Sequence, residues 1–280
     1  MSEALRIAPM DAAEIALALD WAAAEGWNPG LADARPFRAA DPDGFLMGRL
    51  GAEPVACISA VNYGEGLGFL GLYICRPEFR GRGHGLALWQ AAMAHFGART
   101  VGLDGVVAQQ PNYRKSGFVL AHRNIRYGGV PALPSASTAG IVPIEGLPAG
   151  AVMSHDRACF GAPRKEFLRG WLDPAERTAL AFVQDGALCG YGVVRQCRQG
   201  WKIGPLFADD EAAASALFAA LVRGREGPVF LDVPEPNAAA RRLAEGVRLE
   251  PMFETARMYR GRAPELPLPR IFGITSFELG

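Results

Sequence analysis

The order of apolar and polar positions predicts the same series of elements twice along the chain. In the first half, residues 44–61 (GFLMGRLGAEPVACISAV) are typical of two strands around a short turn, and residues 68–77 (GFLGLYICRP) of a third strand. In the second half, residues 180–197 predict a hairpin around Asp185-Gly186, where glycine accepts the positive φ of a tight turn. Residues 200–209 then predict the next strand.

A helix is predicted after that strand in each half, because apolar residues recur there at a spacing of three and four. The residues on the two apolar faces are Leu86, Trp89, Met93 and Phe96 in the first half and Ala214, Leu217, Phe218 and Leu221 in the second. Each helix is followed by a strand, a Pro-Asn pair, a second helix and a last strand. The chain therefore predicts a duplicated α+β unit.

The two units are separated by residues 127–141 (YGGVPALPSASTAGI), which are rich in Gly, Pro, Ser and Ala and have no apolar period. Such a composition is typical of a linker. We therefore predict a first domain over residues 1–129, a linker over 130–140 and a second domain over 141–280, each long enough to form its own core.

Composition limits the kinds of partner. The 280 residues are 50% hydrophobic and carry 29 basic and 29 acidic side chains, so no global charge favours nucleic acid or a membrane surface. Residues 1–21 contain acids at regular intervals, which is unlike a secretory signal or a membrane span. We expect a cytoplasmic protein, a monomer or homodimer, without nucleic-acid or membrane partners.

Cysteine and histidine give no sign of a disulfide framework or a metal site. The five cysteines are odd in number and form no Cys-x-x-Cys pair, and the four histidines are dispersed. This pattern is typical of reduced, mostly buried thiols in a cytoplasmic protein. The cysteines are Cys57, Cys75, Cys159, Cys189 and Cys197.

A glycine-rich, basic loop precedes the first of the two apolar helices, in residues 76–90 (RPEFRGRGHGLALWQ). Such a loop can direct several backbone N–H groups, and the positive end of the helix, at one anion. Arg80 and Arg82 would add guanidinium donors suited to phosphate. The alternative is a tight turn with solvated arginines. The second half has the acids 209–211 at this place, which suit an ordinary helix start and would repel phosphate.

Two common phosphate motifs are excluded by spacing. A P-loop needs Gly-Lys followed by Ser or Thr, which the loop lacks. A dinucleotide fingerprint needs Gly or Ala at its third position, where Leu86 or Leu88 stands, depending on which glycine begins the count.

Two segments resemble a known family. Arg80, Gly83 and Gly85 match the Arg/Gln-x-x-Gly-x-Gly/Ala loop of the GNAT-type N-acetyltransferases. The segment NYRKSGF, about 30 residues later, resembles the family's Tyr-x-x-x-Gly-Phe segment, with its tyrosine at Tyr113. The second half is similar as a degenerate copy, in which Arg242 stands in place of the tyrosine. Taken whole, including the ending FGITSFELG, the chain is similar to tandem GNAT proteins.

The resemblance implies two tandem α/β/α domains, each with a mixed, largely antiparallel sheet flanked by helices. It also implies direct transfer of an acetyl group from acetyl-CoA to a primary amine of a small, amino-acid-like acceptor in a ternary complex, without a metal. The strand LYICRP would splay from its neighbour, and the N–H groups of residues 81–86 would hold the CoA pyrophosphate. The implied cofactor-binding residues are Cys75, Arg80, Gly81, Arg82, Gly83, His84, Gly85, Leu86 and Asn112.

Asn112 departs from the family's spacing. In many relatives an asparagine nine residues before the glycine contacts the cofactor. Asn237 keeps that distance from Gly246, whereas Asn112 lies only five residues before Gly117. The second helix of the first half is therefore predicted to be the shorter one.

The proton donor is also implied by the resemblance, whereas the general base is not: a carboxylate or a water chain could take the proton of the amine. A tyrosine, with an ordinary pKa near ~10, stays protonated at neutral pH and can supply the proton that the departing thiolate needs. That residue would be Tyr113, whose alternative role is packing on the sheet. Asp104, on the strand before it, is the candidate general base. Histidines 95 and 122 are expected to be structural.

Other activities stay open. The acceptor could be a protein N-terminus or a lysine, or the chain could be a non-catalytic acyl-CoA-binding sensor. A nucleotide-dependent enzyme is disfavoured by the failed spacing. Residues 154–172, which mix charged and aromatic side chains, predict an amphipathic helix with a solvated face, or alternatively a wall of the acceptor pocket.

Overall fold

The computed structural model describes residues 4–132 and 137–280, and it confirms the predicted repeat of elements. The first half contains β1 (Leu5–Pro9), α1 (Ala12–Ala24), α2 (Ala34–Ala40), β2 (Phe45–Leu50), β3 (Glu53–Tyr63), β4 (Leu67–Cys75), α3 (His84–Phe96), β5 (Thr100–Val106), α4 (Gln110–Lys115) and β6 (Val119–Gly129). The second half contains β7 (Ile141–Pro143), α5 (Ala149–Phe160), α6 (Lys165–Trp171), β8 (Arg177–Gln184), β9 (Ala187–Gln196), β10 (Trp201–Ala208), α7 (Glu211–Val222), β11 (Val229–Pro234), α8 (Ala238–Gly246), β12 (Glu250–Arg260) and β13 (Ile271–Gly273).

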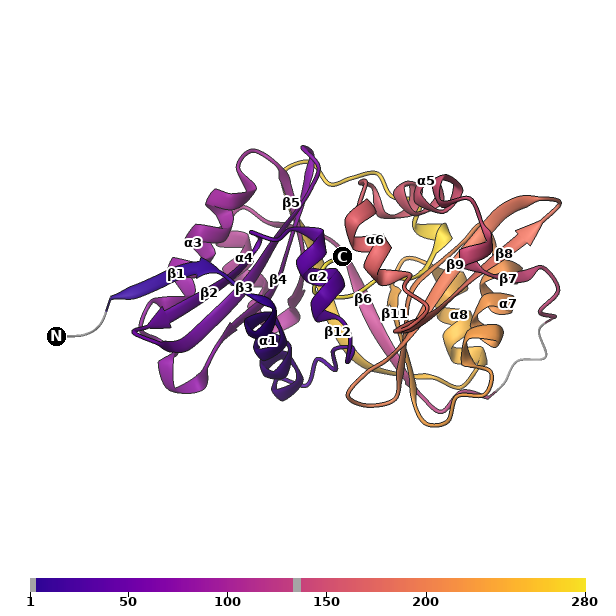
Figure 1. Cartoon of the computed structure of the whole chain (residues 1–280), viewed down its shortest axis with the longest axis horizontal. Coiled ribbons are helices and arrows are strands. Elements are labelled where there is room, and N and C mark those ends of the chain that lie inside the picture. Colours follow the sequence, from indigo (N-terminus) through magenta and orange to yellow (C-terminus); the bar gives the residue numbers. More distant parts are fainter. Residues whose placement is uncertain (1–3, 133–136) are drawn as a thin grey trace.

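The strands of both halves form one mixed sheet (Figure 1). Its order is β1-β2-β3-β4-β5-β12-β6-β11-β10-β9-β8-β7, with β13 beside β10. Within the described residues the pairs are antiparallel except β4–β5 and β10–β11, which are the matching pairs of the two halves. The α+β class and the largely antiparallel sheet flanked by helices are confirmed.

Each half gives its last strand to the other half. β6 lies between β12 and β11, and β12 lies between β5 and β6, so the two strands cross the centre of the molecule in Figure 1. The repeat in the sequence does not predict this exchange. The division into domains 1–129 and 141–280 stays a prediction, and part of the linker, residues 133–136, lies outside the described residues.

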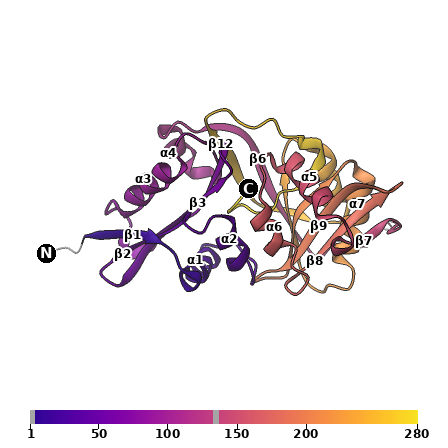
Figure 2. The same cartoon turned by 45° about the horizontal axis from the view of Figure 1, so that its top comes forward.

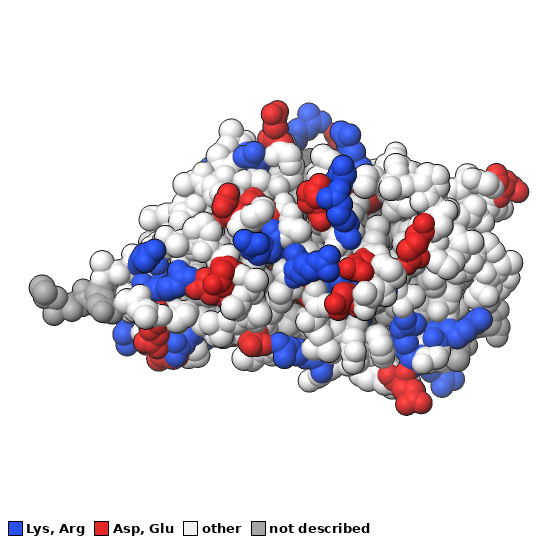
Figure 3. All heavy atoms as spheres, viewed as in Figure 1, with Lys and Arg blue, Asp and Glu red and all other residues white. Residues whose placement is uncertain are grey.

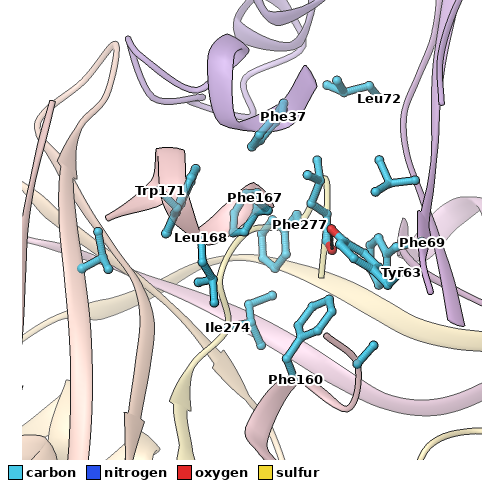
Figure 4. Packing of buried hydrophobic residues seen from close by; sticks show 14 of the residues in the cluster. Phe37, Tyr63, Phe69, Leu72, Phe160, Phe167, Leu168, Trp171, Ile274 and Phe277 are labelled. Atoms are coloured by element: carbon cyan, nitrogen blue, oxygen red, sulfur yellow. Dashed lines mark hydrogen bonds between the residues drawn. The ribbon is translucent and has the colours of Figure 1, made fainter. Parts of the chain in front are cut away.

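The helices cover both faces of the sheet. In the first half α3 and α4 lie on one face and α1 and α2 on the other (Figure 2). One hydrophobic core combines residues of α1, α2, α5 and α6, so it belongs to both halves. Its centre is aromatic: the Phe37 and Trp171 rings stack 6.1 Å apart, and Phe167 lies 4.8 Å from Trp171 (Figure 4). Helices α5 and α6 of the segment 154–172 thus form a core between the halves rather than a mostly solvated face.

Buried ion pairs reinforce the contact between the halves. Asp33, in the segment between α1 and α2, is 1% exposed and lies 3.1 Å from the Arg177 guanidinium and 3.3 Å from that of Arg195. Burial alone would raise the pKa of the Asp33 carboxyl, but Arg195 and Arg177 lower it overall. The carboxylate therefore stabilises the fold above its unfolded pKa of ~3.9, and this contribution is lost as the pH falls through the folded pKa.

Replacing Asp33 by alanine should therefore lower the free energy of unfolding by about 3–5 kcal/mol, because two buried guanidinium groups lose their counter-ion. Urea unfolding at pH 7 measures this loss, and the difference from the wild type should shrink below about pH 4. Asp173→Ala, which removes an ion pair to the largely exposed Arg35, is the control and should cost at most about 1 kcal/mol. Equal losses in the two variants would contradict the assignment.

The surface agrees with the even charge balance of the sequence. On the face shown in Figure 3, basic and acidic side chains are interspersed and form no extended patch of one sign. Among the described residues, no helix combines the length and apolar character needed to span a membrane.

Candidate functional site

A cavity opens where β4 and β5 separate. The two strands pair only from Leu67 to Leu70 and from Thr100 to Leu103, which confirms the predicted splay. Beyond these residues lies a cavity of about 680 Å³, lined by residues 70–75 and 103–106. The register of β4 on β3 shifts here and Leu72 has a φ of 45°, which are features of a β-bulge that bends the strand away.

The cavity reaches both faces of the sheet. Neighbouring strand residues point to opposite faces. A Cβ on Gly105 would lie 2.2 Å from the Tyr113 ring, so Gly105 faces α4 and its neighbour Asp104 faces the other side. Thr255 of β12 pairs with Val106 of β5, so the Thr255 side chain points to the same face of the sheet as Asp104. All of these residues line the cavity, which therefore connects the α3–α4 face with the face of α1 and α2.

The glycine loop leaves backbone donors free at the start of α3. Gly81 and Gly83 have φ values of 76° and 86°, and Gly83 is the N-cap and provides no side-chain cap. Within the described residues, no protein group accepts a hydrogen bond from the N–H groups of residues 81–86. In the second half the Asp210 side chain accepts from Ala213 N at 2.8 Å, which confirms an ordinary helix start there.

The side chains of the loop border the free N–H groups. The Arg80 guanidinium donates to the Cys75 carbonyl oxygen at 2.8 Å and to the Glu25 carboxylate at 2.6 Å, so it ties the loop to β4 and α1. The Arg82 guanidinium lies 5.5 Å from the Phe79 ring centroid. Leu86 is 61% exposed at the rim of the cavity.

Two further loop residues have defined surroundings. A Cβ on Gly85 would lie 2.8 Å from the Tyr73 hydroxyl, so only glycine fits there without displacing Tyr73. The His84 Nε2 atom is enclosed and has no partner within the described part of the chain. Cys75 is a free thiol whose pKa is raised by burial, which disfavours a reactive thiolate.

Tyr113 lies on α4 and lines the cavity. Its ring stacks on Trp89 with centroids 5.9 Å apart, and Trp89 contacts Tyr73 in turn. Burial, with a smaller effect of Tyr73, raises the pKa of the Tyr113 hydroxyl to about 12, so it is protonated at neutral pH. The packing on Trp89 is therefore observed, and the role of Tyr113 as proton donor stays a prediction.

Asn112 is exposed beside Tyr113 and lines the cavity, and its amide donates to Gln109 at 2.8 Å. Helix α4 has six residues and α8 has nine, as the spacing predicts. Asn237 caps α8 by accepting from Ala240 N, and its amide donates to the Ile271 carbonyl at 3.0 Å.

Asp104 lines the cavity, but its carboxylate is already engaged. Its oxygens accept from the Arg257 guanidinium at 2.8 and 2.6 Å and from the Asn124 amide at 2.7 Å. Burial raises the pKa of Asp104, although Arg257 acts in the opposite direction. A paired carboxylate is a weaker candidate for the general base, and Arg257 reaches it only because β12 lies beside β5.

Part of the cavity wall was not predicted. It comes from the loop after α1 and from the second half, through Trp27, Phe253, Thr255, Phe277 and Glu278. The segment 274–280 is buried throughout and runs against Gly71, where a Cβ would lie 2.1 Å from the Glu278 carbonyl oxygen. None of residues 154–172 lines this cavity.

The corresponding gap of the second half is filled. β10 and β11 pair in parallel only over residues 201–203 and 229–231, and β13 then pairs with β10 at Leu206 and Phe207. Arg242, in place of the tyrosine, forms a 2.7 Å ion pair with Glu211. The two halves therefore differ at the loop, the tyrosine and the gap.

Across residues 4–132 and 137–280, no cluster of three His, Cys, Asp or Glu side chains could hold a metal ion.

Comparison with known proteins agrees with these features. A sequence model of the acetyltransferase (GNAT) family matches residues 13–118, and a model of an acetyltransferase (GNAT) domain matches residues 152–273. Holothin acyltransferase of Pseudoalteromonas sp. (strain SANK 73390) is 34% identical over 263 residues, which cover 93% of this chain and 90% of the relative.

Solved structures show the same fold over the whole chain. A protein from Pyrococcus horikoshii has a TM-score of 0.85 at 22% identity and covers 99% of this chain and 96% of its own. A tandem GNAT protein from the clavulanic acid biosynthesis pathway has a TM-score of 0.60 at 18% identity, with 93% and 100% covered. With the cavity, the loop and these matches in view, the chain belongs to the GNAT acyltransferases, as a tandem member of the family.

Proposed function

We propose that the protein is an N-acetyltransferase that moves the acetyl group of acetyl-CoA to a primary amine of a small molecule. The observation that carries this proposal is the row of free N–H groups at residues 81–86, which opens onto the cavity between β4 and β5. A helix N-terminus with unpaired donors favours a phosphate group. Only the first half has this combination among the residues that the structure describes.

In this proposal the pyrophosphate of CoA lies on the loop, with Arg82 beside it. The pantetheine arm then follows the free edge of β4 near Cys75, past the exposed Leu86, toward the point where β5 diverges. Arg80 holds the loop in position, because its guanidinium donates hydrogen bonds to both the Cys75 carbonyl oxygen and the Glu25 carboxylate. Asn112 borders the entrance from α4, where its amide is free to turn from Gln109 to the cofactor.

The transfer is direct, within a ternary complex. The amine approaches from the face of Asp104 and Thr255 and attacks the thioester carbonyl, while Tyr113 stands on the opposite face. Its protonated hydroxyl supports a role as the acid that protonates the departing thiolate. A binding-only sensor would not need this acid.

The acceptor is proposed to be small because the cavity is closed on its inner side by the buried segment 274–280. The relative named holothin acyltransferase supports a small-molecule acceptor as well. A protein terminus or lysine is the second candidate acceptor. Five free cysteines, three of them buried, support a reducing cytoplasmic setting.

The test is a screen that follows release of free CoA thiol from acetyl-CoA with small amines and with lysine-containing peptides. We expect amine-dependent thiol release with a small amine. Activity with peptides alone would indicate a protein acceptor instead of a small amine. Tight binding of acetyl-CoA without turnover on any amine would favour the non-catalytic acyl-CoA-binding sensor.

A further inference from the structure

One carboxylate at the cavity wall has no protein partner. Glu278 is 3% exposed and lines the cavity. Within the described residues its Oε1 atom is enclosed and accepts no hydrogen bond. Buried polar atoms are nearly always paired, so an unpaired carboxylate oxygen beside a cavity points to a partner that enters from the cavity.

The other buried carboxylates are occupied. Asp33 pairs with Arg177 and Arg195, Asp104 with Arg257, Asp156 with Arg164 and Asp232 with Arg126. Glu278 is thus the one buried acid of the described chain that forms no ion pair.

The cations near Glu278 are held by other groups. Arg126 binds Asp232 through two nitrogens, and Arg195 contacts Asp33. The Lys202 ammonium donates to the carbonyl oxygens of Asn28 at 2.8 Å and Trp27 at 3.4 Å, so it fixes the loop after α1. Each of these cations is thus held by another group, and within the described residues none of them forms an ion pair with Glu278.

Aromatic side chains surround the same part of the cavity. Trp27, Phe253 and Phe277 line it, and the last two rings lie 6.0 Å apart. Phe277 lies beside Phe167 in the core between the halves in Figure 4. Phe253 is 36% exposed, so it forms an outer edge, and the Thr255 hydroxyl oxygen beneath has no partner in the described chain.

We propose that Glu278 binds the ammonium group of the acceptor and takes its proton, and that the acceptor carries this group on a flat aromatic body held by Trp27, Phe253 and Phe277. The inference rests on the proposed N-acetyltransferase function and names its general base and acceptor class. Flat apolar bodies suit aromatic walls, and a buried carboxylate suits a primary ammonium group.

The proton balance is complete. The ammonium gives one proton to the Glu278 carboxylate, and the nitrogen lone pair forms the new C–N bond with the thioester carbonyl carbon. The C–S bond breaks with its electron pair on sulfur, and the thiolate takes the Tyr113 proton. The second proton of the nitrogen returns to the Tyr113 oxygen, and Glu278 releases its proton to solvent.

The experiment compares Glu278→Gln with the wild type, using acetyl-CoA with phenethylamine or tryptamine as acceptor and butylamine as the aliphatic reference. Acetyl-CoA affinity should stay within about twofold, and kcat/KM for the aryl amines should fall about 10²–10³-fold at pH 7. Part of the loss should be recovered near pH 10, where solvent deprotonates the amine. Glu254→Gln is the matched control, because Glu254 lies on the adjacent β12, is paired with Arg123 and does not line the cavity.

Glu278→Asp, which keeps a carboxylate, should retain more activity than Glu278→Gln and guards against a variant that merely misfolds. Unchanged turnover in Glu278→Gln, a loss that high pH does not relieve, a preference for butylamine, or acylation of none of these amines would overturn this inference. Failure of the wild type to bind acetyl-CoA would instead overturn the proposed function.

Discussion

Replacing Gly83 by aspartate is expected to weaken acetyl-CoA binding at least about 100-fold, or about 2.7 kcal/mol. Gly83 is the N-cap of α3 and stands among the free N–H groups of residues 81–86. An aspartate there would place a negative charge, and a side chain able to cap the helix, where the pyrophosphate is proposed to lie. Calorimetric titration of acetyl-CoA measures the loss.

A second glycine provides a control for the backbone strain that the substitution itself introduces. Gly186, in the β8–β9 turn, has a φ of 77° and, like Gly83, no atom within 4 Å of an added Cβ. Gly186→Asp therefore introduces the same residue in a similar conformation, far from the loop in sequence and structure. It should bind acetyl-CoA like the wild type. Equal affinity of the two variants would contradict the phosphate site.

Replacing Tyr113 by phenylalanine should lower kcat about 10²–10⁴-fold with little change in acetyl-CoA affinity. The substitution keeps the ring that stacks on Trp89 and removes only the hydroxyl. The thiolate would then have to leave without a positioned acid. Steady-state thiol release, with the dissociation constant of acetyl-CoA measured in parallel, separates the two effects.

Tyr73→Phe is the comparison, because Tyr73 lines the same cavity and packs against the same Trp89 ring. It should lose much less activity than Tyr113→Phe. A larger loss for Tyr73→Phe would indicate that Tyr73 of β4 is the proton donor. Full activity of Tyr113→Phe would show that Tyr113 only packs on Trp89.

Local patterns of residues are sufficient to predict the repeated strands and helices after residue 44 and the part of the cavity wall that the first half provides. Helix α3 follows from its apolar spacing and from the glycines that need positive φ at positions 81 and 83. The acids at the matching place of the second half, Asp210 among them, distinguish an ordinary helix start from the anion loop, since a side-chain cap and a phosphate compete for the same N–H groups. Tyr113 follows from the resemblance of the segment NYRKSGF to the family's Tyr-x-x-x-Gly-Phe segment.

The strand exchange could not be predicted in the same way. β6 and β12 have similar apolar patterns. The local sequence therefore does not decide whether each strand pairs with strands of its own half or of the other half. The consequence is large at the site: Arg257 reaches Asp104, and Thr255 and Phe253 reach the cavity. Glu278 was missed for a related reason, because one acid in an apolar ending has no periodic signal.

We propose that the chain binds one acyl-CoA, at the site in its first half. The most direct measurement is the stoichiometry of acetyl-CoA binding by calorimetry on the full chain. We predict one acetyl-CoA per chain, because β13 fills the gap between β10 and β11 while the gap between β4 and β5 stays open. Two acetyl-CoA molecules bound per chain, or none, would contradict a single site between β4 and β5.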